Sequence, residues 1–309
     1  MPSQTKDLTF GLELEITRLS SDADRIIRER NFKRHRDGSI QVDTGDGDDS
    51  SGTELVTPTM SVSVTFNPDG DGTMTIDHRD TARIVADLCA CAAKVNKTCG
   101  LHVHLGRPES STSTRSKWEP ERVRTFLIVC RQLEQKMFEL SPSSRQNNRF
   151  CKKISEEYNE TDLVSYYPMG NVSPNKYDNS KRYCWVNLIE TRRTGTNESG
   201  GRGPATGTLE IRLLGNVRRY DYIWAWTSMW LKMAAYCAFY PPTLAIAHCT
   251  GVTMKRDMEL VAQAKSNATR STTQTPADPS TPSTRRSVTF DEDGFDGQTA
   301  TGTGPIIGG

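Results

Sequence analysis

Three short apolar segments of the sequence each carry two charged or imidazole side chains that are two residues apart. The pairs are Glu13 and Glu15, His102 and His104, and Glu210 and Arg212. Alternate residues of a β-strand point to the same face of a sheet, so each pair would project from one side of a strand. A buried carboxylate is costly unless it is paired with a cation or bound to a metal. We therefore expect these strands, together with a fourth that carries Glu54, to form a floor of carboxylate and imidazole groups.

The chemistry that such a floor supports is the binding of divalent cations. Oxygen ligands suit Mg²⁺ or Mn²⁺, and one or two imidazoles are compatible with either ion. Residues two apart lie about 6.6 Å apart along a strand. That spacing suits two ions better than one, and two-metal sites stabilise phosphoryl transfer. Arg212 would compete with cations in a site that only binds metal, whereas beside a nucleotide it would neutralise phosphate charge.

Each pair also has a purely structural interpretation when it is considered alone. Two glutamates on one strand are often solvent-exposed, two histidines can form a structural pair, and Glu210 with Arg212 can form a cross-strand ion pair. The basic run at 32–38 is more typical of a solvent-exposed face than of a binding patch. The combination of pairs on several strands is what indicates a site.

The elements that must position these residues alternate between strands and helices. Expected strands cover 9–16, 53–58, 99–106, 182–191 and 208–215, with a hairpin at 61–77 and a further strand after the DGS turn at 37–39. Expected helices cover 20–31, 78–96, 118–140, 220–240 and 254–265. This order, with a hairpin that pairs antiparallel, indicates the α+β class. We predict one folded domain at 1–262 and a disordered tail at 263–309, which is too rich in Ser, Thr, Pro and Gly to form a core.

Composition excludes several classes of protein. The formal net charge is +1, which argues against strong, sequence-independent nucleic-acid binding. No apolar stretch reaches the roughly 18 residues of a membrane span, and the first residues lack the apolar core of a signal peptide. We therefore expect a cytoplasmic protein. Its eight cysteines should be free thiols in that compartment, and without a CxxC pair they are unsuited to a tetrathiolate zinc site.

Seven segments in order resemble one family of enzymes. They are FGLELE at 10–15, DGS at 37–39, TELVTP at 53–58, CGLHVHLG at 99–106, SRQNNRFC at 144–151, RYCWVNL at 182–188 and GTLEIRLLG at 207–215. The sequence resembles the amidoligase family of glutamine synthetase-like carboxylate–amine ligases. The resemblance implies a curved, mainly antiparallel sheet around an ATP site. It also implies ATP-dependent joining of a carboxylate to an amine through an acyl phosphate, with Mg²⁺ or Mn²⁺.

The resemblance also suggests roles for individual residues. Metal ligands are expected at Glu13, Glu15, Glu54, His102 and Glu210, with His104 as a further candidate. Arg212 matches the phosphate-contacting arginine, and Arg212 and Glu210 are the residues expected to take part in catalysis. Arg182 and Asn187 match substrate or phosphate contacts, and Arg145 is a weaker match of the same kind. The expected substrates are small-molecule or peptide carboxylates and amines, while the base that deprotonates the amine and the oligomeric state stay open.

Two other functions remain open on the sequence. One is a zinc-dependent or cupin-like metal hydrolase, for which the remaining histidines, His35, His78 and His248, offer few additional ligands. The other is a non-catalytic member of the fold that binds a nucleotide or a peptide. Retention of Glu13, Glu15, His102, Glu210 and Arg212 favours an enzyme over such a binding module.

Overall fold

The computed structural model describes residues 4–42, 52–66, 74–77, 79–106, 118–158, 183–188, 208–215 and 217–273, and the statements below concern these residues. The strands are β1 (Gln4–Ile16), β2 (Arg18–Leu19), β3 (Lys33–Asp37), β4 (Gly52–Val56), β5 (Met60–Phe66), β6 (Met74–Asp77), β7 (Ala92–Lys94), β8 (Gly100–Gly106), β9 (Val186–Asn187) and β10 (Leu209–Gly215). The helices are α1 (Ala23–Arg30), α2 (Arg79–Ala90), α3 (Pro120–Leu140), the 3₁₀ turn η1 (Ser143–Arg145), α4 (Ile154–Glu157), α6 (Tyr220–Phe239), α7 (Pro242–Thr250) and α8 (Val252–Thr273).

All pairs of neighbouring strands described in the main sheet are antiparallel. Its order is β3-β4-β1-β8-β10-β9, and β5 and β6 form a hairpin whose first strand also pairs with β1. β4 and β5 share one edge of β1 because β5 pairs with residues 4–10 and β4 with residues 13–16, and the register shifts by one residue between them. At this shift the Thr57 N–H donates to the Leu12 carbonyl, and the Thr57 hydroxyl oxygen accepts from the Leu12 N–H, both at 2.9 Å.

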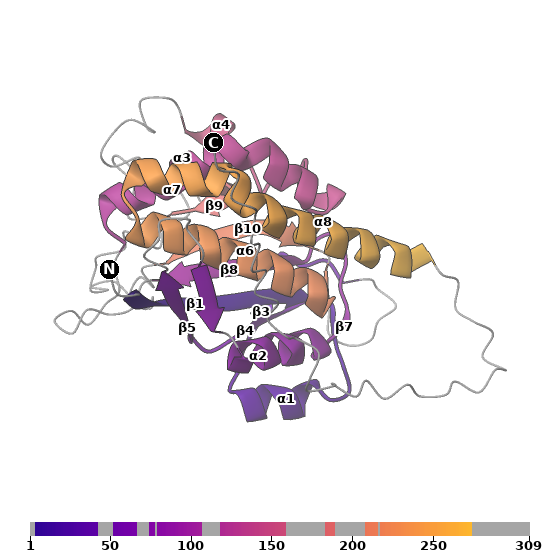
Figure 1. The fold of residues 1–309 in the computed structure, drawn as a ribbon. Helices are drawn as coiled ribbons and strands as arrows, with labels where there is room; N and C mark the ends of the chain where they lie inside the picture. Colours follow the sequence, from indigo (N-terminus) through magenta and orange to yellow (C-terminus); the bar gives the residue numbers. More distant parts are fainter. Residues whose placement is uncertain are drawn as a thin grey trace, which may run out of the picture. The chain divides into compact units, whose positions relative to one another are not determined.

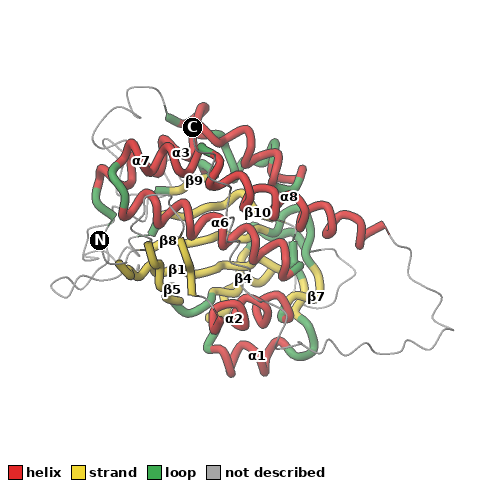
Figure 2. Tube along the Cα trace, in the orientation of Figure 1, coloured by secondary structure: helices red, strands yellow, loops and turns green. Residues whose placement is uncertain are grey.

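Helices cover one face of this sheet (Figures 1 and 2). α6 packs on β1 and β8, and α3 packs on β10. Leu12, Val103 and Ile211 point to the helices and are completely buried. Trp226 and Trp230 of α6 lie in the same core, with ring centroids 5.8 Å apart. Apolar burial on this face leaves the opposite face of the same strands for the polar side chains.

Most predicted elements are present, but one expected strand lies elsewhere, one expected helix is shorter, and one helix was not expected. The helix expected at 78–96 ends at Ala90, and Ala92–Lys94 forms β7 instead. The strand expected after the DGS turn precedes it instead, because Lys33–Asp37 pairs with β4 and the Ser39 N–H closes the turn onto Asp37 Oδ1 at 2.7 Å. Exposure of residues 33–36 confirms that the basic run faces solvent. Helix α7 was not expected, although Pro242 stands at its first turn, where proline is favoured.

The chain divides into two units, Met1–Ser271 and Thr272–Gly309. Helix α8 runs to Thr273, so residues 263–273 of the predicted tail are helical. Lys265 explains part of this, because its Nζ donates to the carbonyl of Ser141 at 2.7 Å and to that of Glu139 at 2.6 Å, at the end of α3. Disorder of 274–309 stays a prediction, since these residues lie outside the described part. None of the helices in the described ranges has the length and apolar character needed to cross a membrane.

Replacement of Leu12 by alanine tests the core between β1 and α6. Leu12 is fully buried, so the variant should lose about 2–5 kcal/mol of unfolding free energy. Leu244→Ala is the matched control, because that leucine is 50% exposed and its loss should cost no more than about 0.5 kcal/mol. Urea unfolding monitored by tryptophan fluorescence measures both. Equal losses would show that the described packing of β1 is wrong.

Candidate functional site

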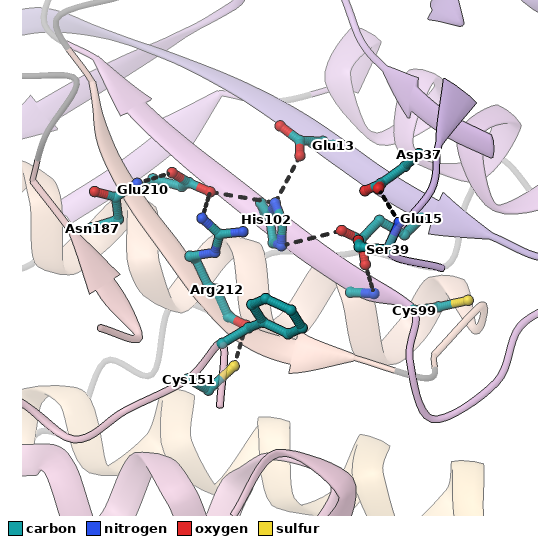
Figure 3. A network of polar contacts seen from close by, with 12 residues as sticks. Glu13, Glu15, Asp37, Ser39, Cys99, His102, Cys151, Asn187, Glu210 and Arg212 are labelled. Atoms are coloured by element: carbon teal, nitrogen blue, oxygen red, sulfur yellow. Dashed lines mark hydrogen bonds and ion pairs between the residues drawn. The ribbon is translucent and has the colours of Figure 1, made fainter. Parts of the chain in front are cut away.

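The register of five strands, β4, β1, β8, β10 and β9, places the sequence-predicted polar residues on one face of the sheet. Directly opposite partners are Glu13 with His102, Glu15 with Glu54, His104 with Glu210, and Glu210 with Asn187. Partners across an antiparallel pair share a face, and this face is the one opposite to the helices. The floor of carboxylate and imidazole groups is therefore present (Figure 3).

His102 lies at the centre of this floor, with carboxylates on both sides of its ring (Figure 3). Its Nδ1 is 2.8 Å from Glu13 Oε1 and 3.3 Å from Glu210 Oε1, and its Nε2 is 3.8 Å from Glu15 Oε1. Only 4% of the side chain is exposed, so water cannot replace these partners. The ring therefore connects the acidic residues of β1 with the charged pair of β10.

His104 extends the floor toward solvent, with 20% of its side chain exposed. Its Nε2 is 3.1 Å from Glu13 Oε2, and its Nδ1 is 3.3 Å from the Thr208 hydroxyl. Burial opposes the charged ring, but the hydrogen bond to Glu13 and the charge of Glu210 raise the pKa of His104 to about 9. Burial alone would raise the pKa of Glu13, yet the neighbouring His102 and His104 hold that pKa well below its ordinary value. Glu13 thus bridges both histidines as a carboxylate.

Glu210 and Arg212 form the charged pair of β10. The Arg212 guanidinium is 3.4 Å from Glu210 Oε1, and the Asn187 side-chain amide donates to Glu210 Oε2 at 2.6 Å. Burial opposes ionisation of Glu210, but Arg212, His104 and His102 lower its pKa overall. The β10–β8 register shifts between Ile211 and Leu214, whereas the Arg212 N–H continues the register with β9 by donating to the Trp185 carbonyl at 2.8 Å.

Glu13, Glu15 and His102 have the donor set of a divalent cation site. Each offers one ligand atom, and these atoms all lie within 4.8 Å of one another. The Gly100 N–H donates to Glu15 Oε2, which leaves Oε1 on the side of His102. Two carboxylates and one imidazole fit Mg²⁺ or Mn²⁺. A cation held by this trio would also offset two carboxylate charges that are largely removed from water.

Glu54 lies on the same face, opposite Glu15 on β4. Burial and the adjacent carboxylates, Glu13 above all, raise the pKa of Glu54 to about 8. A cation between these carboxylates would favour the ionised form and reverse that shift. The pKa of Glu54 should therefore fall when a metal binds nearby. Glu54 is not one of the three residues that have metal-type spacing, which are Glu13, Glu15 and His102.

The structure thus assembles nearly all of the predicted site residues. Those on the shared face are Glu13, Glu15, Glu54, His102, His104, Asn187, Glu210 and Arg212. Arg182 lies outside the described residues, and Arg145 is buried at one end of the face. The metal, nucleotide and catalytic roles of these residues stay predictions.

A buried glutamate on α3 that the sequence did not reveal supports the backbone around Arg212. Glu134 accepts hydrogen bonds from Trp185 Nε1 at 2.9 Å, from the Ser155 hydroxyl at 2.9 Å and from the Ile154 N–H. The Trp185 carbonyl in turn accepts from the Arg212 N–H at 2.8 Å, and the Cys151 thiol donates to the Arg212 carbonyl at 3.2 Å. Trp185 therefore holds the N–H of Arg212, and Cys151 holds its carbonyl. Glu134 anchors Trp185 directly and bonds to Ile154 and Ser155, which follow Cys151 closely in the chain.

The stability of the metal-free protein should depend on pH through Glu54. Its folded-state pKa of about 8 lies above its ordinary value of 4.5, so the folded protein holds this proton more tightly than the unfolded chain does. That stabilisation is complete below pH 4.5 and is lost as the pH rises to 8. His104, whose pKa rises from 6.5 to about 9, adds a loss of the same sign between those values. In EDTA the melting temperature should therefore fall between pH 6 and pH 9, and less steeply in Glu54→Gln. If the melting temperatures of both proteins fell equally between pH 6 and pH 9, the raised pKa of Glu54 would be contradicted.

Replacement of Glu134 by glutamine tests the anchor beneath Arg212. The glutamine amide would face donors that now bond to the carboxylate, so the variant should lose about 2–5 kcal/mol of unfolding free energy. Glu139→Gln makes the same chemical change on the same helix, at a side chain that is 53% exposed. Its effect should stay within about 0.5 kcal/mol. Chemical unfolding of both variants measures these losses. Equally small losses of unfolding free energy would show that Glu134 does not anchor the backbone near Arg212.

The sequence matches one known protein family. The family model described as "putative amidoligase enzyme" matches residues 28–213, which is more than half of the chain. No curated protein matches the sequence. The matched range contains His102, Glu210 and Arg212, while Glu13 and Glu15 precede it and reach the same face through the pairing of β1 with β8. The chain belongs to the amidoligase family, a family of ligase-type enzymes.

Proposed function

We propose that this protein is an ATP-dependent carboxylate–amine ligase that forms an amide or peptide bond through an acyl phosphate. The observation that carries the proposal is the convergence of Glu13, Glu15, His102, Glu210 and Arg212 on one largely buried face. A triphosphate needs cations and a guanidinium beside it, and this face offers a metal-type donor set at one end and Arg212 at the other. Family membership supports the ligase class.

Each residue has a part in the proposed reaction. Glu13, Glu15 and His102 would hold Mg²⁺ or Mn²⁺, which supplies positive charge to the phosphates when it is bound. Arg212 would stabilise the charge that develops as the γ-phosphoryl moves. Glu210 and Asn187 would keep the guanidinium in position, since Asn187 bonds to one oxygen of Glu210 and Arg212 lies beside the other.

The reaction balances as two substitutions. An oxygen of the substrate carboxylate attacks the γ-phosphorus, the bond to the β-phosphate oxygen breaks, and ADP leaves. The amine of the second substrate then attacks the acyl carbon, inorganic phosphate leaves, and the amine gives up a proton to a base. We propose small-molecule or peptide substrates and a cytoplasmic location, in keeping with the eight free, buried thiols.

The alternative functions have less support. A multi-histidine zinc site would need more imidazoles, but His35 is exposed on β3 and His248 stacks on Tyr236 with ring centroids 4.8 Å apart. Among the described residues, His102 is the one histidine in the group that has metal-type spacing. A non-catalytic binding protein would have no requirement for an ionised Glu13 close to both a histidine pair and Arg212.

Measurement of ADP and phosphate release tests the proposed function. The protein is incubated with ATP, Mg²⁺ and pools of amino acids, polyamines and peptides. Release that depends on the added substrates should fall by about 100-fold or more in Glu13→Gln and in Arg212→Ala. Glu29→Gln serves as control, because that carboxylate is 57% exposed on α1, and it should retain the activity of the wild type.

Two results would contradict the ligase. Hydrolysis without ATP by a zinc-loaded protein would indicate a metal hydrolase. ATP binding without turnover, with every substrate pool, would indicate a binding protein.

A further inference from the structure

Two glycines leave a gap at one end of the polar face. Gly100 of β8 and Gly215 of β10 are directly opposite partners, and Gly100 is two residues before His102, so both positions face the candidate site. Neither residue has a side chain to fill the space above it. The sheet is therefore recessed at the end of the face where Glu15 lies.

The guanidinium of Arg145 occupies this recess. Arg145 ends the turn η1 and is only 2% exposed. A β-carbon added to Gly215 would overlap Nε, Nη2 and Cζ of Arg145, and one added to Gly100 would lie 2.9 Å from Nη2. The two glycines are thus needed for the arginine to enter.

Arg145 is held beside two of the three residues that have metal-type spacing. The β-carbon position of Gly100 is 3.0 Å from Glu15 Oε2 and 3.0 Å from His102 Nε2, as well as 2.9 Å from Arg145 Nη2. The guanidinium donates to the carbonyl of Cys99 and to the Cys151 thiol, the latter at 3.8 Å. Glu15 Oε2 also accepts from the Gly100 N–H. The peptide that bonds to Glu15 is thus the one whose carbonyl Arg145 holds.

We propose that Arg145 is a positioning residue that fixes the Glu15 carboxylate for a divalent cation. This inference rests on the proposed function, because it assumes that Glu15 binds metal. Arginine stays charged in a buried site and presents its donors in a fixed plane, so it can hold the Cys99–Gly100 peptide rigid, and the N–H of that peptide bonds to Glu15 Oε2. The other carboxylate oxygen, Oε1, then stays directed toward His102 Nε2, at 3.8 Å.

This role differs from the one that the family resemblance suggested. A phosphate contact needs donors that reach the ligand, whereas Nη1 and Nη2 of Arg145 donate to the Cys151 thiol and the Cys99 carbonyl. The remaining donor, Nε, is buried against Gly215 and has no hydrogen-bond partner among the described residues. Groups behind a metal ligand commonly change metal affinity by about 10–100-fold when they are mutated. A positioning role therefore predicts weaker metal binding when Arg145 is changed, whereas a phosphate contact predicts weaker ATP binding.

The test uses variants that keep the positive charge, because removal of the charge would itself alter attraction of a cation. Arg145→Lys loses the planar donors, and Gly215→Ala displaces the guanidinium. Binding of Mn²⁺ is measured by electron paramagnetic resonance without nucleotide, and binding of ATP is measured separately in EDTA. We expect Mn²⁺ binding to weaken by about 10–100-fold in both variants, with ATP binding in EDTA unchanged.

Matched controls separate this effect from general damage. Arg149→Lys changes an exposed arginine of the same segment, and Gly38→Ala adds a methyl group where no atom lies within 4 Å. Both should bind Mn²⁺ as the wild type does. Circular dichroism checks folding. Cys151→Ala is a milder variant in case neither of the others folds, and a several-fold loss of Mn²⁺ binding is expected in it. This change removes the thiol that accepts from Arg145 and also that thiol's hydrogen bond to the Arg212 carbonyl, so ATP binding in EDTA is measured in it as well.

The outcomes are distinct. Unchanged Mn²⁺ binding in the folded variants would overturn the positioning role, and a loss of ATP binding in EDTA alone would make Arg145 a phosphate contact. If Cys151→Ala is the only variant that folds, unchanged Mn²⁺ binding in it would likewise overturn the proposal. Failure of the wild type to bind Mn²⁺ at all would instead contradict the proposed metal site, whatever the variants do.

Discussion

Carboxylates that are removed from water must be matched by positive charge or by hydrogen-bond donors, and this requirement dominates the polar face of the sheet. Glu13, Glu15 and Glu210 surround His102, and all three carboxylates are at least four-fifths buried. The imidazoles of His102 and His104 can carry at most two positive charges beside these three carboxylates. Arg212 supplies further positive charge, 3.4 Å from Glu210. We propose that a divalent cation binds among Glu13, Glu15 and His102, where its charge would offset carboxylates that are largely removed from water. This proposal favours a metal-dependent enzyme over a structural ion-pair cluster.

The rest of the fold serves to hold these side chains in one register. β1, β8 and β10 are adjacent and antiparallel, so residues distant in sequence become direct partners. Helices α3 and α6 bury the opposite side of the same strands, and a slip of one residue would exchange the polar and apolar faces. Glu134 extends this control to the backbone of Arg212 through Trp185. Stability and site geometry therefore depend on the same packed layer.

Strand alternation made the central part of the site predictable, because a spacing of two residues fixes which side chains share a face. Glu13, Glu15, His102 and His104 follow directly from it. The parts that could not be predicted depend on contacts between remote segments. Arg145 sits in a short turn, and its burial depends on Gly100 and Gly215, which lie on different strands. Glu134 has the sequence context of an ordinary helical glutamate, and the strand Lys33–Asp37 forms because β4 offers an edge rather than because its own residues are apolar. The predicted curvature of the sheet and its likeness to glutamine synthetase stay predictions.

The central claim is that Glu13, Glu15 and His102 hold a divalent cation. Its most direct test is a crystal structure of the protein grown with Mn²⁺ and a non-hydrolysable ATP analogue, with anomalous scattering used to locate the metal. We expect an anomalous peak within bonding distance of these three residues, with the phosphates lying between that peak and Arg212. A peak bound elsewhere, or a face that remains without metal while the nucleotide binds at another surface, would contradict it.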